Sequence, residues 1–122
     1  MRPPAMKREQ LQFRPGFRLS VGNRQSQSAV MVIPPGGSEG GSDNSHRGSD
    51  QWLYVIDGTG VAIVNGHRSA LKPGVMMLIE RGDIHELRNT GRKLLKTINI
   101  YVPPAFKDEE TPLPAGQPKQ KA

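Results

Sequence analysis

The sequence predicts an all-β fold, a small antiparallel jelly-roll barrel with flexible N- and C-terminal arms. Short β-like runs alternate with turn signals along most of the chain. Glycine and proline account for 14 and 11 of the 122 residues, and both disfavour helix interiors. No stretch shows the apolar spacing of an amphipathic helix, and the length suits one domain rather than two. Roughly eight strands at such short spacing are typical of a barrel or sandwich.

Turn residues set the boundaries of the expected strands. Pro34-Pro35 ends the second run, and residues 34–45, PPGGSEGGSDNS, are expected to form a loop throughout. Asn65-Gly66 lies between two strand-like runs and predicts a type I′ hairpin. Pro103-Pro104 ends the last run. The expected strands are residues 17–21, 28–33, 52–56, 61–64, the segment after Asn65-Gly66, 75–79, 84–88 and 94–102.

The two ends of the chain differ in composition from its middle. Residues 1–13 are expected to form a basic N-terminal arm and residues 14–103 the barrel. Residues 104–122 form a polar, proline-rich tail that is too poor in apolar residues to fold alone. An arm on a small β protein can add a strand to a neighbouring subunit.

Charge and cysteine content limit the possible partners. The net charge is +6, but the basic residues are scattered, so nucleic acid is not an expected partner. The absence of cysteine excludes disulfides and a zinc–thiolate site. No apolar run approaches the roughly 20 residues of a membrane span, and the N-terminus has no signal-peptide core. We therefore expect no membrane association and a cytoplasmic location.

Four polar side chains are candidates for a common site inside the barrel. Strand alternation places Gln51 and His85 on faces that they share with aliphatic residues. Asn44 and His46 are two positions apart and share a face if their segment is extended. Burying these groups is costly unless they are paired or bind something. A metal ion would satisfy all four together.

Other polar residues have weaker cases. Asp50 and Glu86 are sequence neighbours of the candidates but point to the opposite face by parity. His67 follows a turn and is expected to be exposed, whereas Glu39 in the glycine-rich segment could supply a substitute carboxylate. Parity alone leaves open whether one face of the last strand lines the barrel, and that face carries Thr97, Asn99 and Tyr101.

Two motifs point to a family. The chain contains G-x5-E-x-G-x2-H-x3-N from Gly74 to Asn89, and a looser N-x-H-x4-Q-x6-G from Asn44 to Gly58. With these motifs the chain resembles a small single-domain cupin of the RmlC-like conserved-barrel type, over about residues 17–103. The family has proline where this chain has Glu80.

The resemblance implies a divalent metal ion held by Asn44, His46, Gln51 and His85. Asn44 stands where the family has histidine, and Gln51 stands where it has glutamate. All four ligands would be neutral, which favours nickel, copper or zinc over harder cations, with iron remaining a candidate. The alternative is a pocket without metal. In that case the amides hydrogen-bond the histidines, or the pocket holds water or a small anion.

The resemblance also implies a small-molecule partner. Small cupins include dioxygenases, isomerases and lyases that act on small organic substrates, so the first expectation is a metal-dependent enzyme. The alternative is a non-catalytic ligand-binding or sensor cupin that has lost its metal. Family members usually form homodimers, often by exchanging an N-terminal strand, and Phe13 and Phe17 could anchor such an exchange.

Overall fold

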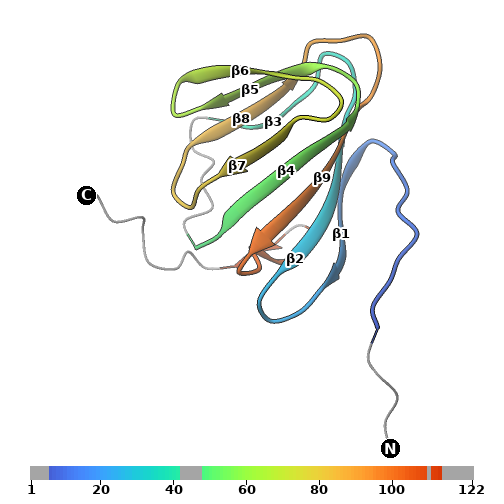
Figure 1. Cartoon of the computed structure of the whole chain (residues 1–122), viewed down its shortest axis with the longest axis vertical. Helices are drawn as coiled ribbons and strands as arrows, with labels where there is room; N and C mark the ends of the chain where they lie inside the picture. The colour runs from blue at the N-terminus through green and yellow to red at the C-terminus, as the bar shows by residue number, and fades with distance from the viewer. Residues whose placement is uncertain (1–5, 42–47, 110, 114–122) are drawn as a thin grey trace, which may run out of the picture.

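Two antiparallel sheets enclose a common core in the computed structural model, which describes residues 6–41, 48–109 and 111–113 (Figure 1). These residues form strands, turns and irregular segments, and no helix occurs among them. The predicted all-β, antiparallel jelly-roll architecture is confirmed.

The larger sheet has five strands and the smaller has four. The larger sheet has the order β1 (Gly16–Gly22), β2 (Gln27–Ile33), β9 (Leu95–Val102), β4 (Asp50–Asp57) and β7 (Met76–Ile79). The smaller sheet has the order β3 (Ser38–Gly40), β8 (His85–Asn89), β5 (Gly60–Val64) and β6 (His67–Leu71). A separate pair consists of β10 (Phe106–Asp108) and β11 (Thr111–Pro112).

The core between the sheets follows from strand alternation. In β4 the odd-numbered residues from Gln51 to Val55 are buried and the even-numbered residues from Trp52 to Ile56 are exposed. Aliphatic side chains of both sheets meet in one cluster, where burial of each side chain larger than alanine contributes roughly 1.5–3 kcal/mol. Its buried members are Met31, Ile33, Leu53, Val55, Ala62, Leu71, Leu87 and Leu95.

The predicted hairpin is present between β5 and β6. Asn65 and Gly66 have φ values of 49° and 82°, the left-handed conformation that a type I′ turn requires at both central positions. The strands are paired from Val64 with His67 to Gly60 with Leu71. The turn chemistry in the sequence therefore predicted the local fold correctly.

The glycine-rich segment corrects one expectation. It was expected to be a loop throughout, but Ser38–Gly40 forms β3, which is paired with β8. Glu39 lies opposite Leu87 in this pair. The strand is three residues long and exposed, so it owes its conformation to hydrogen bonds from β8 rather than to its own propensity.

Gly58 shows why the first motif ends in glycine. Its φ is +89°, and a Cβ atom there would lie 2.3 Å from the carbonyl oxygen of Leu94. Any side chain would both strain the backbone and clash with the start of β9. The glycine thus lets β4 pass close to β9 before the chain turns into β5.

Both ends of the described chain pack against the barrel. Ahead of β1, Lys7 Nζ donates to the Gly22 carbonyl at 2.7 Å, and Ser20 donates to Glu9. After β9, the Phe106 ring lies 4.9 Å from that of Phe17. These contacts tie residues on either side of the predicted barrel to its larger sheet.

Candidate polar site inside the barrel

Gln51 and His85 lie on the inner faces of the two sheets, as parity predicted. Gln51 on β4 is 1% exposed, and His85 on β8 is 4% exposed. On the same strands Leu53 and Leu87 belong to the core cluster, which shows that this parity is the inner one. Two polar side chains therefore line the interior beside aliphatic residues.

Both residues belong to the same end of the barrel. Gln51 is paired with Ile79, the last residue of β7, and the chain then turns through residues 80–84 directly into His85. On the other side of β8, the Gly41 backbone N–H donates to the His85 carbonyl at 3.1 Å. The two strand ends are thus joined by a short connection.

Asn44 and His46 fall in residues 42–47, outside the described residues. The described flanks of this segment are informative. Gly41 on one side is bonded to His85, and Asp50 on the other side directly precedes Gln51. The chain therefore leaves and re-enters the described structure beside the two inner polar residues.

The environment of His85 favours the neutral form of its imidazole. Burial lowers its pKa, while a backbone hydrogen bond to Asp83 and the charge of Asp83 oppose the shift. Nδ1 lies 3.4 Å from the Asp83 carbonyl oxygen. A carbonyl can only accept, so this contact favours the proton on Nδ1 and presents Nε2 as the ring's acceptor.

Gln51 is held by a chain of buried side chains. Its Nε2 donates to Asn99 Oδ1 at 2.9 Å, Asn99 Nδ2 donates to Thr97 Oγ1 at 3.0 Å, and Thr97 donates to the Met31 carbonyl at 2.8 Å. Gln51 Oε1 is buried and has no hydrogen-bond partner among the described residues. Such an acceptor is rare in a folded protein and needs an explanation.

The structure also resolves which face of the last strand is the inner one. Thr97 and Asn99 are 0% exposed and Tyr101 is 2% exposed, so all three face the interior. Sequence reasoning grouped them correctly but could not orient them. The role of Thr97 and Asn99 in holding Gln51 had no signal in the sequence, because it depends on the register between β4 and β9.

The acidic neighbours behave as surface residues. Asp50 Oδ1 accepts from the Arg81 backbone N–H at 2.9 Å, and Glu86 pairs with Arg88 at 3.1 Å. His67 is exposed, as expected. None of these contacts involves the inner polar residues.

Glu39 differs from these acids because it faces inward. Its cross-strand partner Leu87 points into the core, and directly opposite residues in an antiparallel pair share a face. Burial raises the pKa of its carboxyl although the residue as a whole remains exposed. Burial also raises the pKa of Tyr101, and the charge of Glu39 adds to that shift.

The inner residues suit a cation in their donor chemistry. Gln51 offers an amide oxygen that has no partner in the described part of the chain, and burial favours the neutral ring of His85. Both groups are ligand types for divalent metals. Within the described ranges, no group of three or more His, Cys, Asp or Glu residues is close enough to form a complete site. A metal would therefore need ligands from residues 42–47 as well.

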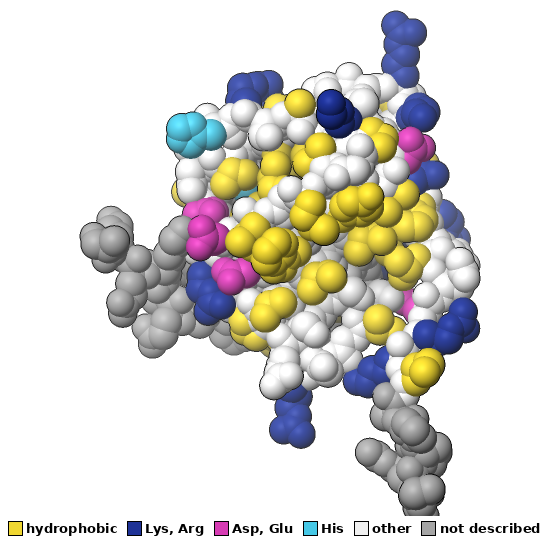
Figure 2. All heavy atoms as spheres, viewed as in Figure 1, with side chains coloured by type: hydrophobic (Ala, Val, Ile, Leu, Met, Phe, Trp, Pro, Cys, Tyr) yellow, Lys and Arg dark blue, Asp and Glu magenta, His cyan; other side chains and the backbone are white. Residues whose placement is uncertain are grey.

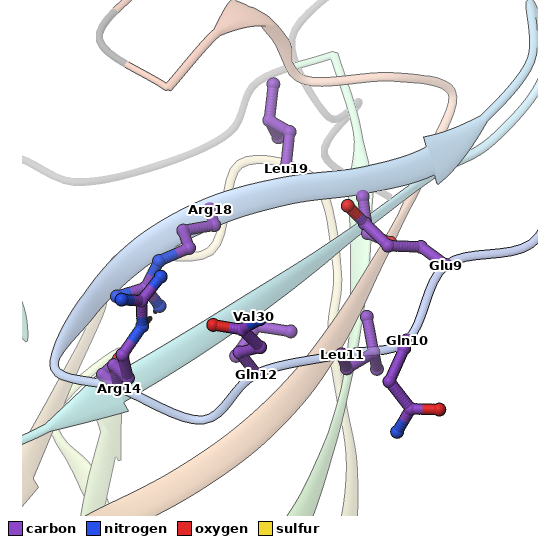
Figure 3. Close-up of a pocket in the computed structure, with 9 residues that line it drawn as sticks. Glu9, Gln10, Leu11, Gln12, Arg14, Arg18, Leu19 and Val30 are labelled. Atoms are coloured by element: carbon purple, nitrogen blue, oxygen red, sulfur yellow. Dashed lines mark hydrogen bonds between the residues drawn. The ribbon is translucent and has the colours of Figure 1, made fainter.

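A hollow lies outside the barrel. It has a volume of about 210 Å³ and lies between residues 9–14 and the strands β1 and β2 (Figure 3). Arg18 lines it, but its guanidinium donates to the carbonyls of Arg14 and Pro15 at 2.8 and 3.0 Å. These hydrogen bonds hold the arm against β1, and they occupy the Arg18 guanidinium.

No helix in the described part of the chain is long and apolar enough to cross a membrane.

Comparison with known proteins places these features in context. The family model of the cupin domain matches residues 29–101. An oxalate-binding protein of Thermotoga maritima is 30% identical over 80 residues, which is 66% of this chain and 64% of that protein. The polyketide synthase protein TcmJ of Streptomyces glaucescens, from the tetracenomycin system, is 32% identical over 72 residues, 59% of this chain and 47% of that protein. The chain thus spans less than two thirds of either relative.

Solved structures share the fold. One from Bacillus halodurans superposes with a TM-score of 0.72 at 26% identity, covering 79% of this chain and 76% of that one. A predicted oxalate decarboxylase from Thermotoga maritima superposes with a TM-score of 0.65 at 26% identity, covering 72% and 79%.

Proposed function

The chain belongs to the cupin family, and from that premise we propose that its barrel binds a divalent metal ion and, through it, a small organic acid. Gln51 and His85 would be ligands from the described structure. Asn44 and His46 would complete the set from the adjoining segment. When bound, the metal would act as a Lewis acid that holds and polarises a carboxylate or carbonyl group.

The unpaired Gln51 Oε1 is the observation that carries this proposal. A buried acceptor without a partner lowers the folding free energy gain by about 1–3 kcal/mol. Gln51 Oε1 is such an acceptor among the described residues, so the fold keeps it at a cost in stability. A cation would remove that cost. The lowered pKa of His85 supports the same function, because a protonated imidazole could not coordinate a metal.

The proposed ligand class follows from charge. Neutral ligands leave the full positive charge on a divalent metal, and an anionic ligand with two donor atoms would compensate for it. Two of the similar proteins are named for oxalate, which is such a ligand. We therefore propose oxalate or a related small dicarboxylate as the first ligand to test.

Metal content tests the first half of the proposal. We expect near-stoichiometric nickel, copper, zinc or iron in the wild type by plasma mass spectrometry, and loss of that metal in His85→Ala. His67→Ala is the matched control, since His67 is exposed on β6 and should not bind the ion. Equal metal in both variants, or none in the wild type, would refute the proposed site.

Ligand binding tests the second half. Calorimetric titration with oxalate should show binding to the metal-loaded wild type and none to the His85→Ala variant. An affinity for oxalate that does not depend on metal would contradict the proposal.

Glu39 supports turnover as a second candidate function. An inward carboxyl with a raised pKa is suited to carry a proton to or from a bound substrate. Glu39→Gln should then abolish consumption of oxalate by the metal-loaded protein without removing the metal. Binding without any consumption in the wild type would favour the non-catalytic alternative.

We also propose a homodimer, supported by the outer face of the larger sheet. Figure 2 shows hydrophobic side chains gathered over β4, β7 and β9. Trp52 lies beside Leu78 on one side and Ile100 on the other, and Tyr54 lies beside Met76. All five are between 37% and 60% exposed. An exposed apolar patch of this kind supports an interaction site on this face.

Light scattering tests the dimer. Leu78→Lys should shift the protein towards the monomer mass, because it inserts a charge into the patch. Ile84→Lys is the control, since Ile84 is 45% exposed but lies in the turn before β8. The same mass for both variants would exclude this face. The exchange of the N-terminal strand stays a separate prediction, which deletion of residues 1–16 tests.

A further inference from the structure

The polarity of the side-chain relay behind Gln51 can be derived from its anchor. The relay ends at the Met31 carbonyl, which can only accept, so Thr97 must donate its single hydroxyl proton there. Thr97 Oγ1 is then available only as an acceptor. The group that faces it at 3.0 Å must be the Asn99 amide nitrogen.

The same logic passes through Asn99 to Gln51. With its nitrogen facing Thr97, Asn99 presents Oδ1 to Gln51, so Gln51 must donate from Nε2. Turning either amide over would bring two acceptors or two donors together in a fully buried environment. Because all three side chains are 0–1% exposed, water cannot compensate for that mismatch.

We infer that Asn99 and Thr97 are positioning residues that hold the Gln51 amide with its oxygen towards the barrel interior, and that this restricts the site to a cation or a hydrogen-bond donor. This inference rests on the proposed function for its ligand. It adds that an anion cannot occupy the position in front of Oε1 directly, because it would face the lone pairs of that oxygen. An anionic ligand reaches that position only through a metal.

Thr97 allows a matched test. Thr97→Val removes the hydroxyl and keeps the shape, whereas Thr97→Ser keeps the hydroxyl and removes a methyl group. In Thr97→Val the Asn99 amide can turn over, and Gln51 then presents Nε2 to the interior. We expect Thr97→Val to bind nickel(II) at least about tenfold more weakly than the wild type in calorimetry, as outer-shell changes do at metal sites. Thr97→Ser should bind nickel(II) with an affinity within about threefold of the wild type, a smaller change than the loss of a residue that positions a metal ligand causes.

A readout independent of metal follows the amide itself. In the metal-free protein, the Gln51 side-chain NH₂ protons should exchange slowly with solvent in the wild type and Thr97→Ser, as seen by NMR. They should exchange rapidly in Thr97→Val. Unchanged protection in Thr97→Val together with unchanged nickel affinity would overturn the inference.

A titration of the wild type with oxalate in excess chelator completes the test. No binding is expected, and measurable binding without metal would also overturn the inference. If the wild type binds no nickel, the proposed function fails, and the inference is decided by the other two measurements. Slow exchange of the Gln51 side-chain NH₂ protons, together with no oxalate binding, supports the inference. Rapid exchange of these protons refutes it.

Discussion

Part of the larger sheet inverts the usual distribution of polarity between its inner and outer faces. On β4 and β9 the interior carries Gln51, Thr97 and Asn99, while the exterior of the same strands carries Trp52 and Ile100. The interior polar groups are joined in one hydrogen-bonded relay, and the exterior apolar groups are exposed. A single chain in water is most stable with apolar side chains inside and polar side chains outside. Each face departs from that arrangement, and each departure suggests a binding partner.

The two departures have different energetic consequences. Inside, one acceptor is left unpaired, and its penalty is removed by a ligand of the right polarity. Outside, apolar area remains in water, and its penalty is removed by any covering surface of matching shape. The inner face can therefore discriminate between small ligands by their polarity. The outer face can discriminate between partners only by their shape.

Truncation of one leucine on each face should show the largest difference. Leu53 is 0% exposed within the core, and Leu78 is 41% exposed outside. We expect Leu53→Ala to lower the free energy of unfolding by about 3 kcal/mol, because it leaves a cavity. Leu78→Ala should lower it by less than about 1 kcal/mol.

Urea denaturation at several protein concentrations measures both values. A dimer through the outer face would make the Leu78→Ala effect depend on concentration, whereas the Leu53→Ala effect should persist at all of them. Equal losses at high dilution would show that the outer face belongs to the core.

Two buried amides within the interior should differ next. Asn89 donates to the carbonyls of Ile33 and Lys93 at 2.7 and 2.8 Å and accepts from Gly91 at 2.9 Å. Asn89→Ala would leave three backbone groups unpaired, and we expect a loss of about 2–3 kcal/mol in unfolding free energy.

Gln51→Met should be milder. It removes the unpaired Oε1 together with one hydrogen bond, so the loss in the metal-free protein should stay below about 1.5 kcal/mol. Metal binding should nevertheless disappear. A loss for Gln51→Met as large as that for Asn89→Ala would mean that Gln51 is structural rather than ligand-binding.

The smallest expected effect concerns Glu39. Its folded pKa is raised above the reference value of 4.5, so the folded state holds its proton more tightly than the unfolded state. The stabilisation from that proton is complete below the unfolded pKa and is lost as pH rises through the raised folded pKa. Glu39→Gln should therefore melt up to about 2 °C higher than the wild type at pH 7 in the presence of chelator.

Melting curves at pH 4 provide the control. At that pH residue 39 is neutral in both the wild type and Glu39→Gln, so the difference between their melting temperatures should vanish. Tyr101 does not titrate in this range, because the ordinary pKa of tyrosine, 10.0, already lies above it and burial raises the pKa of Tyr101 further. A difference of the same size at both pH values would show that the charge of Glu39 is irrelevant to the fold.

The sequence predicted those parts of the fold that depend on local chemistry. Asn65-Gly66 predicted the hairpin because that turn type requires two residues with positive φ. Alternation placed Gln51 and His85 inside because the side-chain period of a strand is two.

Features set by pairing between distant strands could not be predicted. β3 forms in a segment with no strand propensity because β8 supplies its hydrogen bonds. The relay requires Asn99, which is paired with Leu53, to lie diagonally across from Gln51 between β4 and β9, and this depends on a register that no local pattern encodes. Asn44 and His46 as ligands stay predictions, since both lie outside the described residues.

The anchoring of the relay in the Met31 carbonyl limits the evolutionary routes open to this site. Gln51→Glu would place a carboxylate against Asn99 Oδ1, and relief would require the Asn99 amide to turn over. That rotation would bring Oδ1 against Thr97, whose proton is already donated to the backbone. A main-chain carbonyl cannot be mutated away, so a descendant with an anionic ligand at position 51 would have to change position 97 or 99 first. The neutral amide at position 51 therefore persists unless position 97 or 99 is substituted before it.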